Sequence, residues 1–227
     1  MLDVAKRYAD LIHRVFCIEG LAGFDTPGHE EIELALVKLY LFTSEKRYLE
    51  LAEYFINERG RGKKDGAYGS FDLEHIQSHL PVREQKTAEG HSVRALYLLC
   101  AMADLARLSK DRSLLLSCQT LYENITNKRM YITGGVGSTF RGESFTYDYD
   151  LPEYTAYCET CASIALALFC RRMWLIDPKG RYGDTAEQAV YNTVLSGISL
   201  SGDKFFYENP ISTDAAKWKF NESRPEA

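Results

Sequence analysis

The chain has 227 residues, of which 45% are hydrophobic and 26% are charged, as in an ordinary globular protein. Its formal charge is -5 and its lysines and arginines are scattered, so nucleic acid is not an expected partner. The longest apolar stretch covers residues 162–169, which is far too short to span a bilayer. The N-terminus has no signal-peptide pattern, and we therefore expect a cytoplasmic protein with no membrane partner.

Apolar residues recur with the 3.6-residue period of a helix in three paired stretches. A short polar break separates the two members of each pair, which is typical of a helix hairpin. The first helices are expected around residues 32–39, 93–100 and 161–168, and the second around 48–55, 114–125 and 186–190. The hairpins repeat about every sixty residues, and this repeat predicts an all-α fold. A short strand is expected at residues 204–207.

Two long connections, residues 60–89 and 130–152, join the hairpins and have little helical periodicity. Loops of this length in a compact domain are often functional. His29, His91 and Glu159 each stand at or just before a first helix. If the hairpins pack side by side with their first helices inside, these residues gather at one end and form a pocket there. The alternative is that each histidine only caps its helix or is solvated.

Cys158 and Cys161 form a C-x-x-C pair, but neither a βαβ pattern nor a second such pair surrounds it. Glu159 and Cys161 would lie on nearly opposite sides of a regular helix. A metal held by both therefore requires the helix to start around Cys161, and a purely structural role of the thiols stays open. The remaining cysteines are expected to be small core hydrophobes: Cys17, Cys100, Cys118 and Cys170.

The glycine-rich connection at residues 131–145 lacks the lysine of a P-loop and carries Glu143 close to Phe145 and Tyr147. Aromatic surroundings disfavour a charged carboxylate, which suits a general acid near neutral pH. The alternative is a solvated loop glutamate. Aromatic rings with carboxylates at the mouth of a helical barrel also suit a carbohydrate ligand, because the rings stack on sugar C–H groups while acids and histidines bind the hydroxyls.

Seven short motifs follow one another between about His29 and Pro210. They are Gly28-His29-Glu30, Pro81-Val82-Arg83-Glu84-Gln85, Gly90-His91-Ser92-Val93-Arg94-Ala95, Tyr131-Ile132-Thr133-Gly134-Gly135, Gly142-Glu143-Ser144-Phe145, Glu159-Thr160-Cys161-Ala162 and Phe206-Tyr207-Glu208-Asn209-Pro210. Together they resemble glycoside hydrolase family 127, the bacterial β-L-arabinofuranosidases. The resemblance implies a partial (α/α)6 barrel of helix hairpins and a retaining glycosidase that acts on L-arabinofuranosides.

The resemblance also implies the roles of individual residues. Glu143 resembles the general acid/base, and Glu159 and Cys161 resemble two of the four zinc ligands. His29, His91 and Tyr207 resemble residues that contact the sugar. Cys158 is not part of the family pattern.

One feature of the family is missing from the sequence. The other two zinc ligands, one of them the nucleophile, are an adjacent cysteine pair, and no Cys-Cys occurs here. We therefore expect residues 1–227 to be an incomplete catalytic barrel, lacking early helices and C-terminal β-sandwich domains. Such a fragment is expected to be inactive by itself, to have an incomplete zinc site and to self-associate through exposed barrel helices.

The residues by themselves are compatible with two other functions. One is a helical-repeat interaction module without catalysis. The other is a helical-barrel epimerase or isomerase, which the Glu159-Thr160-Cys161 match disfavours.

Overall fold

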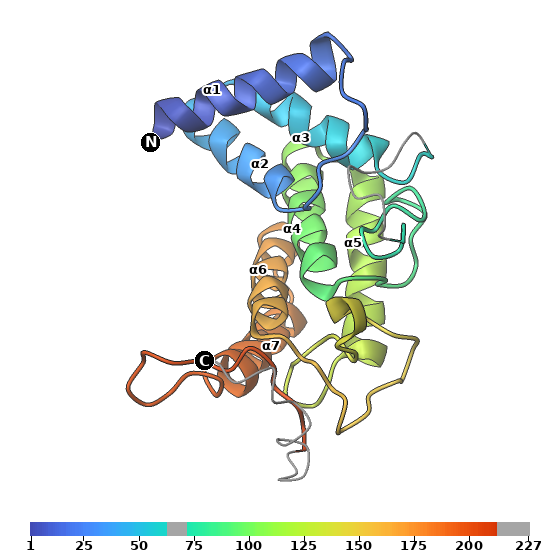
Figure 1. The fold of residues 1–227 in the computed structure, drawn as a ribbon, viewed down its shortest axis with the longest axis vertical. Coiled ribbons are helices and arrows are strands. Elements are labelled where there is room, and N and C mark those ends of the chain that lie inside the picture. Colours follow the sequence, from blue (N-terminus) through green and yellow to red (C-terminus); the bar gives the residue numbers. More distant parts are fainter. Residues whose placement is uncertain (63–71, 213–227) are drawn as a thin grey trace.

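The computed structural model describes residues 1–62 and 72–212, so residues 63–71 of the first long connection lie outside the described part. Within the described residues the chain is helical, with a few isolated β-bridges (Figure 1). The α-helices are α1 Leu2–His13, α2 Ile32–Thr43, α3 Lys46–Glu58, α4 Ser92–Ser109, α5 Arg112–Asn124, α6 Thr160–Ile176 and α7 Gly180–Ala189. One wider helical turn follows each of α1, α5 and α7, at Arg14–Ile18, Ile125–Arg129 and Val190–Val194.

The three predicted hairpins are confirmed as α2–α3, α4–α5 and α6–α7. Ser44 and Lys110 end the first helices of two hairpins in the left-handed conformation, with φ of 61° and 56°. This conformation stops a helix and lets the chain reverse. Asp111 then caps α5, because its Oδ1 accepts from the backbone N–H groups of Ser113 at 2.8 Å and Leu114 at 3.1 Å.

Helix α1 was not predicted from the sequence. Ala9 is its one buried residue, and Ile12 packs partly buried against the core. It packs against α3 outside the predicted hairpins (Figure 1). The prediction that Cys17 lies in the core is wrong, because Cys17 is exposed in a turn after α1 that buries no residue. The other three core cysteines are buried as predicted.

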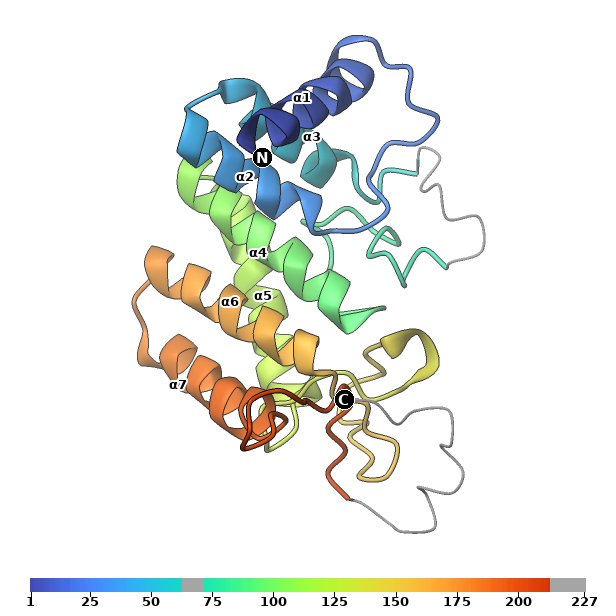
Figure 2. The same cartoon turned by 60° about the vertical axis from the view of Figure 1, so that its left-hand side comes forward.

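The first helix of each hairpin packs beside the first helix of the next. Helix α4 lies between α2 and α6, and the second helices α3, α5 and α7 pack behind their own partners. In Figure 2 α2, α4 and α6 run in the same direction, with their N-termini on the side where the long loops lie. Because α4 is covered on several sides, it is apolar and buried almost all round. This arrangement is that of part of an α/α barrel.

The predicted strand at residues 204–207 is reduced to a single bridge between Ile198 and Phe205. Ser199 N–H donates to the Lys204 carbonyl at 2.9 Å, which closes a tight loop instead of a ladder. Phe205 and Phe206 remain half exposed, so no second strand or core covers this segment within the described residues.

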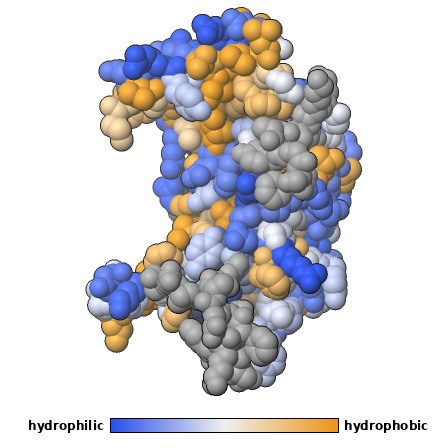
Figure 3. All heavy atoms as spheres, viewed as in Figure 1, coloured by the Kyte–Doolittle hydropathy of each residue, from blue (hydrophilic) through white to orange (hydrophobic). Residues whose placement is uncertain are grey.

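Several large apolar side chains lie on the surface of the described residues. Val4, Tyr8, Leu41 and Phe42 are exposed on α1 and α2, and Figure 3 shows apolar patches among hydrophilic surface at that end of the molecule. Surface of this kind favours association, and the self-association expected from the sequence stays a prediction. None of the helices in residues 1–62 and 72–212 is long and apolar enough to cross a bilayer.

A buried ion cluster joins the ends of the first two hairpins. Arg59, at the C-terminus of α3, is fully buried together with Glu30 and Glu33. Its guanidinium donates to Glu30 Oε1 at 3.0 Å, to Glu33 Oε1 at 3.1 Å and to the Ile76 carbonyl at 2.8 Å. Arg94, in the first turn of α4, lies 3.4 Å from Glu30 Oε2. Two cations and two carboxylates therefore share one interior site.

Replacing Arg59 by methionine is expected to destabilise the fold by about 3–5 kcal/mol, because it leaves two buried carboxylates without their shared cation. The matched control is Arg47→Met, whose exposed ion pair with Asp10 at 2.6 Å is expected to contribute about 0–1 kcal/mol. Urea unfolding followed by circular dichroism measures both. An equal loss of unfolding free energy in the two variants would contradict a dominant role of the buried ion cluster in stability.

Candidate active site

Two residues expected at helix starts occupy N-cap positions. His91 caps α4, and its Nδ1 accepts from the Arg94 backbone N–H at 3.4 Å. Since Nδ1 is an acceptor, the proton of the neutral ring is on Nε2. Glu159 caps α6, which begins at Thr160, and this confirms that Glu159 lies before the helix and Cys161 in its first turn. The side chains of Glu159 and Cys161 can therefore point to the same side of the start of α6.

The second long connection, residues 130–152, folds back onto the start of α4. His91 and Ser144 form an antiparallel bridge, and the Phe145 N–H donates to the Gly90 carbonyl at 2.9 Å. The Ser92 hydroxyl donates to the Glu143 carbonyl at 3.0 Å. These contacts fix Glu143 beside His91, although the two residues are far apart in the sequence.

Glu143 is held by two side chains. Its Oε2 lies 2.8 Å from His91 Nε2, and its Oε1 accepts from the Tyr157 hydroxyl at 2.7 Å. Its backbone has φ of 53°, in the left-handed region, which costs on the order of 1 kcal/mol for a residue other than glycine. The aromatic partner of its carboxylate is the buried Tyr157. Of the two aromatic residues named from the sequence, Phe145 is buried in the core and Tyr147 is 73% exposed.

His91, Glu143 and Glu159 converge at one point. One donor atom of each lies within 4.8 Å of the others. Glu159 is 2% exposed, and its Oε2 has no hydrogen-bond partner. Burial raises the pKa of Glu159, and the charge of Glu143 adds to this effect. Burial lowers the pKa of His91, although its bond to Glu143 opposes the shift.

Cys161 and Tyr207 lie on the other side of Glu159. The Cys161 thiol donates to Glu159 Oε1, and Tyr207 is hydrogen bonded to Glu159. Burial, followed by the Glu159 contact, raises the pKa of the Cys161 thiol to about 12, so the thiol is protonated near neutral pH. Tyr207 is placed by the Thr160 N–H, which donates to its carbonyl at 3.0 Å.

Cys158 does not belong to this group. It is fully buried in a small cluster with Tyr131 and Ala156, and burial raises its pKa to about 12. Its φ of 43° is left-handed, and Asn209 Nδ2 donates to its carbonyl at 2.9 Å. Cys158 therefore shapes the backbone before Glu159, and the C-x-x-C spacing carries no chemistry.

His29 reaches the site through Tyr97. Their ring centroids are 6.2 Å apart, and burial, with a smaller effect from Glu159, raises the pKa of Tyr97. Arg94 donates to the Gly28 carbonyl and so ties the segment before α2 to the first turn of α4. All six residues singled out in the sequence therefore lie around one end of the first helices.

Sequence reasoning missed His75 and Tyr157. The ring of His75 meets that of His91 edge to face, with centroids 5.4 Å apart, and the His91 N–H donates to the His75 carbonyl at 3.2 Å. This contact requires Gly90, because a Cβ there would lie 1.9 Å from the Glu74 carbonyl oxygen. The signal available in the sequence was that glycine, directly before His91.

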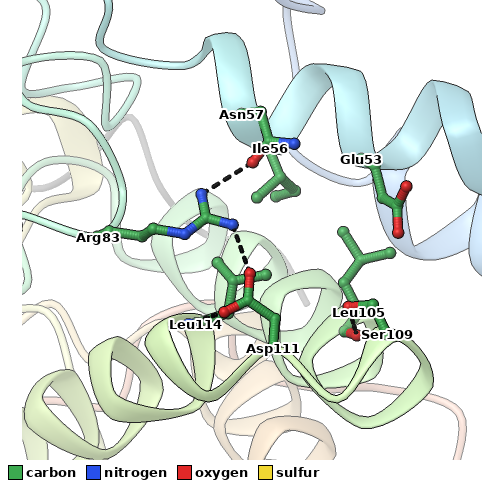
Figure 4. Close-up of a pocket in the computed structure, with 8 residues that line it drawn as sticks. All are labelled: Glu53, Ile56, Asn57, Arg83, Leu105, Ser109, Asp111 and Leu114. Atoms are coloured by element: carbon green, nitrogen blue, oxygen red, sulfur yellow. Dashed lines mark hydrogen bonds and ion pairs between the residues drawn. The ribbon is translucent and has the colours of Figure 1, made fainter.

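A cavity of about 420 Å³ lies elsewhere, beside the turn between α4 and α5 (Figure 4). Arg83 lines it and donates to Asn57 Oδ1 at 2.8 Å and to Asp111 Oδ2 at 2.7 Å. The guanidinium is thus occupied in bracing α3 against α5. This motif arginine has a structural role, and the cavity is separated from His91 by the length of α4.

Three partly buried histidines are expected to contribute less stability as the pH drops below about 6.5, while the raised pKa of Glu30, about 7, acts in the opposite direction. Burial lowers the pKa of His29, His75 and His91 below their ordinary 6.5, so the unfolded chain takes up protons first. Their contribution is therefore present above pH 6.5 and lost as the pH falls towards the folded-state pKa values. The urea midpoint of the double variant H29Q/H75Q should therefore rise relative to that of the wild type as the pH falls through this range. A constant difference between the two midpoints would contradict this origin.

A family model for the β-L-arabinofuranosidase GH127 catalytic domain matches residues 1–226. The chain is 42% identical over 226 residues to a non-reducing end β-L-arabinofuranosidase of Bifidobacterium longum subsp. longum, and covers 34% of that protein. It therefore spans about a third of the length of this curated relative.

Solved structures agree with this match. A GH127 β-L-arabinofuranosidase from Geobacillus stearothermophilus superposes with a TM-score of 0.89 at 48% identity, over 96% of this chain and 36% of that one. A second GH127 β-arabinofuranosidase gives 0.87 at 40% identity, over 94% and 32%. A D-mannose isomerase, at 0.60 and 12% identity over 98% and 57%, shares the fold alone. The chain belongs to the GH127 β-L-arabinofuranosidase catalytic-domain family.

Proposed function

We propose that this chain forms the acid/base half of a retaining glycosidase that cleaves β-L-arabinofuranosides, and that Glu143 is the general acid/base. The proposal rests on the position of the Glu143 carboxylate, which is hydrogen bonded to His91 and Tyr157 and lies close to the buried Glu159. Because the chain covers about a third of its relatives, the activity is inferred for the protein in its longer form.

Glu143 would move the proton in both steps of the reaction. It first donates a proton to the leaving-group oxygen and then accepts one from the attacking water. Tyr157 donates to Oε1 and His91 Nε2 lies 2.8 Å from Oε2, so both oxygens are oriented while each keeps a second lone pair for the proton. With a side-chain exposure of 32%, Glu143 is open enough to meet a ligand while its partners fix its direction.

Glu159 and Cys161 are proposed to supply two donors to zinc. The residues fit such an ion, because Glu159 Oε2 is buried without a partner and the Cys161 thiol lies against the other oxygen. A bound zinc ion would hold cysteine as thiolate near neutral pH. His29, His91 and Tyr207 are proposed to bind the sugar hydroxyls, with the rings of Tyr97 and Tyr157 close to them.

A helical-repeat interaction module accounts less well for these observations. It gives no reason for two carboxylates and an imidazole to converge in one partly buried place. The isomerase alternative rests on a likeness of fold alone. The cytoplasmic location expected from the sequence stays a prediction.

The replacement Glu143→Gln tests the acid/base role in the protein expressed from its complete reading frame. Hydrolysis of an aryl β-L-arabinofuranoside should fall by about 10²–10⁴-fold, because the amide cannot exchange the proton. The control Glu153→Gln changes an exposed acid just after the same connection and should keep wild-type rates. Full activity of Glu143→Gln would refute the assignment.

Sugar binding can be measured on the 227-residue chain itself. Saturation-transfer NMR should detect L-arabinose, and His91→Ala should weaken the signal because it removes a hydroxyl partner and the support of Glu143. D-arabinose serves as the stereochemical control. An interaction module predicts no response to either sugar, or the same response with and without His91.

A further inference from the structure

Arg94 contacts two segments that carry histidines of the candidate active site. Its backbone N–H donates to His91 Nδ1 at 3.4 Å. Its guanidinium donates to the carbonyl of Gly28, the residue before His29. Since the two segments lie at the starts of different hairpins, Arg94 is a direct physical link between the two histidines.

The guanidinium of Arg94 is held in turn by the buried ion cluster. Its Nη1 lies 3.4 Å from Glu30 Oε2, and Glu30 Oε1 accepts from Arg59 at 3.0 Å. Glu30 is fully buried, and the Arg94 side chain is 12% exposed. A buried carboxylate that loses one of its cationic partners is left with uncompensated charge, which is strongly unfavourable. The two arginines therefore keep Glu30 in one position, and Glu30 keeps Arg94 against Gly28.

The same cluster also reaches His75. Arg59 donates to the Ile76 carbonyl at 2.8 Å. Gln77 Nε2 donates to the carbonyl of His75 at 3.1 Å and to that of His91 at 3.3 Å. Because the rings of His75 and His91 meet edge to face, these contacts hold one imidazole against the other. The cluster thus braces the backbone beside all three histidines of the site.

The charge of Arg94 acts on the rings as well. Burial is the largest cause that lowers the pKa of His29 and of His75, and the charge of Arg94 is the next for both. A neutral imidazole offers one donor and one acceptor, whereas a protonated ring offers donors only. Hydroxyl groups both donate and accept, so the neutral ring is the better partner for a sugar. Other charges act on the same two rings: Glu31 raises and Arg59 lowers the pKa of His29, and Asp72 and Glu143 raise that of His75.

We propose that Arg94 is a positioning residue of the sugar site, which holds His29 and His91 at one separation and orientation for the hydroxyl groups of a single ligand. This inference rests on the proposed function, in which both histidines bind the sugar. Arg94 acts through them and carries out no step of the reaction itself. Because a displacement of about 1 Å can cost about 10²-fold in rate, loss of the link should weaken the site although every group that contacts the sugar is still present.

NMR titration of the 227-residue chain with L-arabinose tests the link. Arg94→Gln removes both contacts of the guanidinium and should weaken binding by about tenfold or more. Arg94→Lys should restore part of the lost affinity, because the ammonium group keeps the charge and can keep one contact. Wild-type affinity in Arg94→Gln would overturn the positioning role. A wild-type chain that binds no L-arabinose would instead refute the proposed function.

Histidine titration by NMR gives a second readout, which does not depend on a sugar. In Arg94→Gln the pKa of His29 and that of His75 should rise, because a positive charge near both rings is removed. In Arg94→Lys both should stay low, since the charge is kept. Unchanged values in Arg94→Gln would overturn the proposal whether or not the chain binds L-arabinose.

The matched control is Arg172→Gln. Arg172 is another buried arginine, and its Nε donates to Asp104 Oδ2 at 2.7 Å between α6 and α4. This change should lower the stability but leave the affinity for L-arabinose and the pKa of His29 as in the wild type. An equal loss of affinity in Arg172→Gln would trace the effect of Arg94→Gln to a weakened fold and overturn the proposal.

A second variant keeps the test decisive if Arg94→Gln does not fold. Glu30→Gln keeps the size of the side chain and one acceptor oxygen, but removes the charge that holds Arg94. Binding of L-arabinose should weaken severalfold, and circular dichroism should show the variant folded. Wild-type affinity in the folded Glu30→Gln chain would overturn the proposal.

Discussion

The fold depends on burying charge where the first two hairpins meet. Arg59 joins Glu30 and Glu33 in the interior, and burial raises the pKa of both glutamates, that of Glu30 to about 7. A buried ion cluster of this kind is a weak source of net stability but a strong constraint on geometry, because removing one partner is costly. Here it fixes the segment before α2 against the end of α3 and, through Arg94, against the start of α4. The site lies at that junction.

The active-site groups are brought together by residues whose backbone conformations are locally unfavourable. Glu143 and Cys158 both adopt left-handed conformations. Glu143 lies in the group with His91 and Glu159, and Cys158 directly precedes Glu159 in the chain. The left-handed conformation is sterically unfavourable for both residues, because neither is glycine. The cost is offset by the bonds of residues 130–152 to Gly90 and Ser92. Rigid placement of Glu143 thus depends on α4, to which the loop is bound.

The helices could be predicted because their apolar residues follow one period, and the placement of Glu159 before α6 followed from the same pattern. His75 and Tyr157 could not be predicted, since both lie in connections without a period. His75 reaches His91 only because Gly90 admits a carbonyl at close range. The sequence predicted aromatic surroundings for Glu143 from Phe145 and Tyr147. Phe145 is buried, but Tyr147 is exposed, and the hydroxyl bonded to Glu143 is that of Tyr157, fourteen residues further along the chain.

The closeness of Glu143 and Glu159 determines the electrostatics of this end of the barrel. Each offers one oxygen within 4.8 Å of the other and of a His91 ring nitrogen. The charge of Glu143 adds to the burial that raises the pKa of Glu159. His91 faces both groups and lies 2.8 Å from Glu143 Oε2. The proposed acid/base and the proposed zinc donor therefore act on one another, so the charge of Glu143 is part of the setting in which Glu159 would hold the ion.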